Sequence, residues 1–159
     1  MSVICRSAKE VLSSSGSIIA SSETKDCFVY AFATAFEMSY DEAHATVKER
    51  FNREDKKGVS SKMIDRKFNE MFDSSDLNVN GRTVQEVIAR PTTQYKLYGE
   101  VKNRALRVES FARKYTSGTY LIYTRDHALT IKDGTVIDNK NDKSIKSLVK
   151  KAYRIGTGQ

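Results

Sequence analysis

The chain has 159 residues, of which 39% are hydrophobic and 30% charged, and it carries a formal net charge of +7 at pH 7. This length predicts one domain over residues 1–159 with a sizeable core, and the composition excludes an integral membrane protein. The apolar run Gly16–Ser22 is too short for a membrane span or for the core of a secretory signal. We therefore expect a cytoplasmic protein that engages no membrane.

The chain has two cysteines, Cys5 and Cys27, which permit at most one disulfide. In a reducing cytoplasm both are expected to be free thiols. Neither lies in a paired Cys or Cys/His spacing typical of zinc. The sequence therefore predicts no metal site and implies no cofactor.

The first strong helix is expected to begin at Cys27, with Asp26 as its N-cap. Residues 1–24 are rich in serine and are typical of a loop, apart from a weak helical segment from Ser7 to Leu12. Apolar residues lie all round the helix after Cys27, which predicts that it is buried at the centre of the domain. These residues are Phe28, Val29, Ala31, Phe32, Ala35 and Phe36.

Three further helices are predicted before Pro91. The segment Ser39–Glu42 has the pattern of a capping box and opens a helix in which His44 is expected on the surface. A third helix buries one face, formed by Ile64, Phe68, Met71 and Phe72. The segment Thr83–Glu86 is another capping-box pattern, and the short helix that it predicts must end before Pro91.

Beyond Pro91 the pattern favours strands. The segment Tyr95–Tyr98 alternates weakly, and one more amphipathic helix, from Leu106 to Tyr115, is expected to stop at Gly118. Three strands are then predicted, at Thr119–Thr124, His127–Lys132 and Thr135–Asn139. Helices come first and an antiparallel sheet second, so the fold class is α+β.

The dipeptide Asp133-Gly134 predicts a two-residue hairpin turn. In that register Lys132 lies opposite Thr135. Because side chains alternate along a strand, His127 and Asp138 then project from one face as diagonal neighbours. A hydrogen bond between the imidazole and the carboxylate is therefore expected.

A helix N-terminus favours the thiolate form of Cys27, and a nucleophilic thiol needs a base that a third group orients. The order Cys27, His127, Asp138 supplies such a set, provided that the buried helix packs on the sheet face that carries the histidine. Each residue also has a simpler interpretation. Cys27 suits a small core residue, His127 a satisfied strand histidine and Asp138 a strand-end residue.

Two segments resemble small papain-like proteins, many of them from phages and bacteria. Asp26–Ala43 resembles the start of such proteins, and Gly118–Ile122 followed by His127–Asp138 resembles their closing hairpin, whereas residues 51–107 show no such resemblance. The resemblance implies a papain-like fold, with N-terminal helices packed on a C-terminal antiparallel sheet. It also implies that Cys27 is the nucleophile, His127 the general base and Asp138 the orienting acid. One departure is that the stretch Ala20–Asp26 lacks the glutamine that papain-like peptidases use as an oxyanion donor.

The predicted function is a cysteine hydrolase, most plausibly a peptidase that acts on a protein or peptide through a thioester, or a related transferase or deamidase. The alternative is a non-catalytic papain-fold protein that engages a host protein or nucleic acid through its basic tail. From Lys140 to Gln159 there are six cations against one anion, Asp142. Its one aromatic residue, Tyr153, falls short of the several stacking aromatics of a nucleic-acid-binding surface, so a solvated helix face is favoured over nucleic-acid binding.

Overall fold

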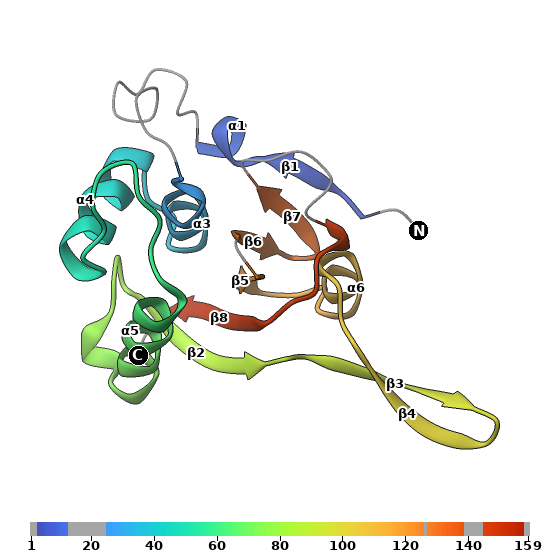
Figure 1. Ribbon diagram of the computed structural model, residues 1–159. Coiled ribbons are helices and arrows are strands. Elements are labelled where there is room, and N and C mark those ends of the chain that lie inside the picture. Colours follow the sequence, from blue (N-terminus) through green and yellow to red (C-terminus); the bar gives the residue numbers. More distant parts are fainter. Residues whose placement is uncertain (1–2, 13–24, 126, 139–144, 158–159) are drawn as a thin grey trace.

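The computed structural model describes residues 3–12, 25–125, 127–138 and 145–157, which form a mixed α+β fold (Figure 1). The helices are α1 (Ala8–Leu12), α3 (Cys27–Ala35), α4 (Tyr40–Arg50), α5 (Ser61–Asp73) and α6 (Val108–Lys114), with a 3₁₀ turn η2 (Ser75–Leu77). The strands are β1 (Cys5–Ser7), β2 (Arg82–Ala89), β3 (Thr92–Leu97), β4 (Glu100–Ala105), β5 (Thr119–Tyr123), β6 (Ala128–Lys132), β7 (Thr135–Asp138) and β8 (Lys151–Thr157).

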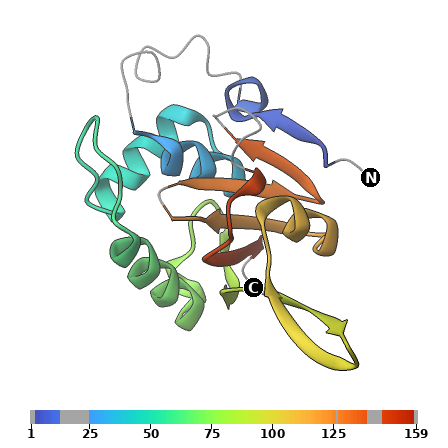
Figure 2. The ribbon, with the colours of Figure 1, turned by 45° about the vertical axis from the view of Figure 1, so that its right-hand side comes forward.

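Six of these strands form one sheet in the order β1-β7-β6-β5-β8-β2. All neighbours in it are antiparallel except β1 and β7, which run parallel. The remaining two strands, β3 and β4, pair only with each other among the described residues, and this ribbon projects away from the main sheet (Figures 1 and 2). The sheet is therefore largely antiparallel, and the ribbon is an appendage to it.

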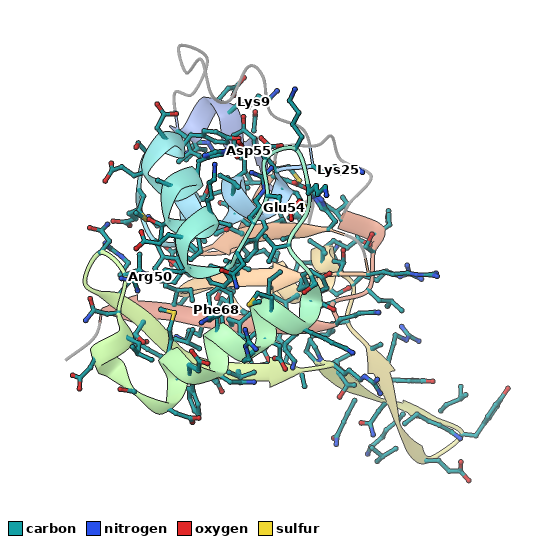
Figure 3. The ribbon with its side chains drawn as sticks, turned by 60° about the vertical axis from the view of Figure 1, so that its left-hand side comes forward. Lys9, Lys25, Arg50, Glu54, Asp55 and Phe68 are labelled. Carbon is teal, nitrogen blue, oxygen red and sulfur yellow. The ribbon has the colours of Figure 1, made fainter. Side chains whose placement is uncertain are left out.

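Buried side chains form two clusters on opposite sides of β5. Leu121 belongs to a cluster with residues of α3, α4 and α5, whereas Tyr120 and Ile122 belong to a cluster with residues of α6. This alternation follows from the two-residue period of a strand. Phe68 of α5 lies inside the first cluster, against Tyr153 of β8 (Figure 3). Both faces of the central strands are thus buried.

The helix starts agree with the sequence at one predicted cap and differ at another. The Ser39 side chain accepts a hydrogen bond from the Glu42 N–H, which confirms Ser39 as the N-cap of α4, and the Glu42 carboxylate accepts from the Ser39 hydroxyl. Asp26 occupies the N-cap position of α3, but its side chain does not cap the helix. It instead accepts a hydrogen bond from the Tyr40 hydroxyl at 2.6 Å.

The helix predicted from Thr83–Glu86 is wrong, because this segment belongs to strand β2. The Thr83 hydroxyl donates to the carbonyl of Met71 instead of capping a helix. Pairing with β8 supplies the backbone hydrogen bonds of this segment, and a register shift occurs between Val84 and Glu86. Tertiary pairing has overridden a short local signal.

The termini of the chain also differ from expectation. Cys5 and Arg6, predicted as loop, form β1 together with Ser7, which was predicted to start the weak helical segment, and that segment is α1, which begins at Ala8. The basic tail is not a helix, because residues 151–157 form β8 between β5 and β2. Four residues of these predictions lie outside the described residues. They are Asn139, the last residue of the third predicted strand, and Lys140, Asp142 and Lys143 of the tail.

Within α5, Phe72 was predicted on the buried face of the helix, but its side chain is half exposed.

Candidate active site

His127 and Asp138 form a buried pair at the open end of the β6–β7 hairpin. Lys132 pairs with Thr135 across the turn, so the predicted register is confirmed. Asp133 and Gly134 both have positive φ, of 48° and 79°, as a two-residue turn of this kind requires. His127 Nε2 lies 2.7 Å from an oxygen of the Asp138 carboxylate.

The charge state of His127 is set by its surroundings. Burial disfavours the imidazolium, but the hydrogen bond to Asp138 and the neighbouring Cys27 thiol outweigh this effect and raise the pKa of His127 to about 9. An ionised carboxylate can only accept, so Nε2 carries the proton that it donates to Asp138. The ring is therefore oriented with Nδ1 as the nitrogen left for the thiol.

Cys27 is the first residue of α3 and is partly exposed. Helix α3 is tied to the sheet by a buried hydrogen bond of 2.7 Å from the Thr130 hydroxyl of β6 to the carbonyl of Ala31. This contact lies one helical turn beyond Cys27 and fixes how α3 sits against the hairpin. The thiol is thereby brought to His127, on whose pKa it acts.

Cys27 and His127 line the same cavity, of about 440 Å³. Its wall also includes the buried residues Phe28, Ile64 and Ala128, and Asp26, the residue before Cys27, lines it as well. His127 Nδ1 is buried and makes no well-aligned hydrogen bond to any described residue. The cavity thus brings a partly exposed thiol together with a ring nitrogen that can exchange a proton with it.

The pair formed by Asp26 and Tyr40 was missed by sequence reasoning. Asp26 is buried, lines the cavity and holds the hydroxyl of Tyr40, which is also buried. The sequence gives a partial signal for this contact, because Tyr40 directly follows the Ser39 cap and is therefore expected at the start of the helix after α3. Asp26 was predicted to cap α3, so its contact with Tyr40 of α4 was not predicted.

The other histidine and the other cysteine lie elsewhere. His44 was expected on the surface but is buried, because the α4 face that carries it also carries the core residues Ala43 and Val47. Its Nε2 lies 3.8 Å from Asp55, on the loop after α4 (Figure 3). Cys5 is exposed on β1.

No group of three or more His, Cys, Asp or Glu residues in the described part of the chain is arranged to hold a metal ion. No helix there is long and apolar enough to cross a membrane. The candidate site therefore comprises Cys27, His127 and Asp138, together with Asp26, which lines the same cavity, and Tyr40, which is bonded to Asp26.

Comparisons with known proteins found no relative with this site. The chain matches no protein-family model, and it matches neither a curated protein nor a solved structure.

Proposed function

We propose that the protein is a papain-like cysteine hydrolase that acts as a peptidase, in which N-terminal helices pack on a C-terminal antiparallel sheet. The observation that carries the proposal is the 2.7 Å bond between His127 and Asp138, with Cys27 in the same cavity and acting on the histidine pKa. A thiol, a base and an orienting acid are the groups that nucleophilic catalysis needs. The proposal places this activity in the cytoplasm, where the thiol stays reduced.

In the proposed reaction the Cys27 thiolate attacks the carbonyl carbon of a peptide bond. The C–N bond then breaks, the imidazolium of His127 gives its proton to the leaving amine, and a thioester remains on Cys27. A water molecule, deprotonated by His127, attacks this thioester and releases the acid and the free thiol. Asp138 holds the ring in one tautomer and stabilises the imidazolium throughout.

The oxyanion in this proposal is held by the backbone N–H of Cys27. First-turn N–H groups of a helix have no partner within the helix, and the helix dipole favours negative charge there. The glutamine that papain-like peptidases use is absent from Ala20–Asp26. Loss of one oxyanion donor costs on the order of 10²–10³ in rate, so slow turnover is expected.

The proposal is tested by incubating the protein with a peptide library and sequencing the new amino termini by mass spectrometry. The wild-type protein should generate cleavage products that Cys27→Ala does not. With one cleaved peptide as substrate, Asp138→Asn should lower kcat by roughly 10²–10⁴-fold, because an amide cannot stabilise the imidazolium.

The matched control is Asp55→Asn, which alters the other histidine–aspartate contact and should leave kcat unchanged. If no peptide is cleaved and Cys27 reacts with iodoacetamide no faster than the exposed Cys5, the peptidase proposal is contradicted. The protein would then be the non-catalytic binding protein considered from the sequence.

A further inference from the structure

A second hollow adjoins the cavity of Cys27, and its lining is strongly cationic. It has a volume of about 770 Å³ and reaches His127, which lines both spaces. Among the described residues its lining includes no carboxylate. The cations in its lining are Arg90, Arg107, Arg125, Lys146 and Lys150.

The positive charge continues toward the apolar wall of the first cavity. A third hollow, of about 390 Å³, is lined by three of these cations, Arg90, Arg125 and Lys150. The same hollow is lined by Ile64 and Tyr123, which also line the cavity of Cys27. The three hollows therefore share walls, and the cationic surface they form lies directly beside the thiol and the imidazole.

Three of the cations have no carboxylate partner among the described residues. No ion pair joins Arg90, Arg125 or Lys150 to an acidic side chain in that part of the chain, whereas Lys151 pairs with Asp65 and Lys146 with Glu109. Unneutralised cations that gather in a concave site produce a positive potential. An anionic ligand would neutralise this positive potential.

The backbone holds two of these cations in place. The Arg90 N–H donates to the Lys150 carbonyl at 2.8 Å, and the Lys150 N–H donates to the Tyr123 carbonyl at 2.9 Å. Arg90 has φ of 46°, in the left-handed region that residues other than glycine seldom adopt. The ends of β2 and β5 and the residue before β8 are thus tied together, which pre-organises the positive surface.

We propose that the second hollow, of about 770 Å³, uses Arg90, Arg125 and Lys150 to bind acidic side chains of a peptide substrate, next to the bond that Cys27 attacks. This inference rests on the proposed function, because a thiolate acts on an acyl carbonyl, which a peptide supplies and a nucleic-acid backbone does not. The third hollow is lined by Tyr123 and the buried Tyr153, but no Phe, Tyr or Trp is among the described residues that line the second hollow. Base stacking, which single-stranded nucleic acids use, is therefore not provided there.

Binding is tested with Cys27→Ala, so that the result does not depend on turnover. The probes are fluorescein-labelled hexaglutamate, hexaglutamine and an oligothymidylate of twelve nucleotides. Hexaglutamate should bind at least about tenfold more tightly than hexaglutamine, and the difference should shrink as salt rises. The triple variant Arg90→Gln/Arg125→Gln/Lys150→Gln should remove most of the difference, whereas Lys9→Gln/Lys48→Gln/Lys102→Gln should retain it.

Equal affinity for the two peptides would overturn the inference. Tighter binding of the oligothymidylate than of hexaglutamate would overturn it in favour of a nucleic-acid ligand. A preference for hexaglutamate in a protein that cleaves no peptide would instead contradict the proposed function alone. The two claims can therefore fail separately.

Reaction of the wild-type thiol with charged reagents links this surface to Cys27. The thiolate displaces iodide from the CH₂ group of either iodoacetate, which is anionic, or iodoacetamide, which is neutral. The ratio of the iodoacetate rate to the iodoacetamide rate should be several-fold higher at Cys27 than at Cys5, and the triple variant should lower it at Cys27 only. A ratio equal at the two cysteines would contradict a positive surface beside the thiol.

Discussion

The two histidines of this chain are both buried beside an aspartate, yet the two pairs differ in almost every other respect. His127 Nε2 lies 2.7 Å from Asp138, whose side chain is 6% exposed. His44 Nε2 lies 3.8 Å from Asp55, whose side chain is 57% exposed. Asp55 also lies 3.3 Å from Lys48, an exposed cation that competes with His44 for its carboxylate.

The comparison shows what makes a histidine–aspartate contact useful for chemistry. Water and Lys48 both compete for the Asp55 carboxylate, and a loop places it, so its orientation toward His44 is weakly determined. The Asp138 carboxylate is shielded from water and held by the register of a hairpin. Cys27, which acts on the pKa of His127, completes the set of thiol, base and acid.

The largest difference between the pairs is expected in the pH dependence of stability. The pKa of His127 is raised to about 9 in the folded protein, against about 6.5 in an unfolded chain. The contribution of this histidine to folding is therefore fully present below about pH 6.5 and is lost as pH rises to about 9. The loss is about 3 kcal/mol at most, measured by urea unfolding at each pH.

The control for this prediction is the other histidine. His127→Ala should remove most of the decline in stability between these two pH values, and His44→Ala should leave it in place. If both variants declined like the wild-type protein, the pairing of His127 with Asp138 would not be the source of the effect.

A smaller difference is expected from breaking the turn that sets the His127–Asp138 register. Gly134 has φ of 79°, and a Cβ there would lie 3.3 Å from the Ala112 carbonyl oxygen. Gly134→Val should therefore destabilise the domain by about 1–3 kcal/mol, as strain in sparsely populated backbone conformations does. Thermal unfolding gives this value, and Cys27 labelling should slow because the dyad is disturbed.

Gly99, at the tip of the β3–β4 ribbon, is the matched control. It has the same φ of 79°, but a Cβ there would meet no atom within 4 Å, and the ribbon is not part of the six-stranded sheet. Gly99→Val should thus have a smaller effect on thermal unfolding and none on Cys27 labelling. Equal effects of the two variants would show that the turn strain alone, and not the packing around the dyad, decides the outcome.

The geometry of the His127–Asp138 pair could be predicted because it depends on short-range rules. A two-residue turn at Asp133-Gly134 fixes the register of its strands, and strand alternation then fixes which side chains share a face. The burial of α3 followed in the same way from apolar residues all round it. What local pattern could not supply was the approach of Cys27 to the hairpin, which depends on packing between residues a hundred positions apart.

The parts that could not be predicted depend on partners distant in sequence. Strand β2 carries a helix-start pattern, but its pairing with β8 decides its structure. The basic tail contributes a central strand because its neighbours, β5 and β2, satisfy its backbone. The contact between Asp26 and Tyr40 joins two helices, and no periodicity within either helix reveals it.

The measurement that tests the central claim most directly is the rate at which Cys27 reacts with iodoacetamide as a function of pH. A thiol paired with His127 should react well below the ordinary cysteine pKa of about 8.5. At pH 6, His127→Ala should slow the reaction of Cys27 by at least about tenfold, and His44→Ala should not change it. Identical pH profiles for Cys27 and Cys5, unaltered by His127→Ala, would contradict the assignment of Cys27, His127 and Asp138 as one site.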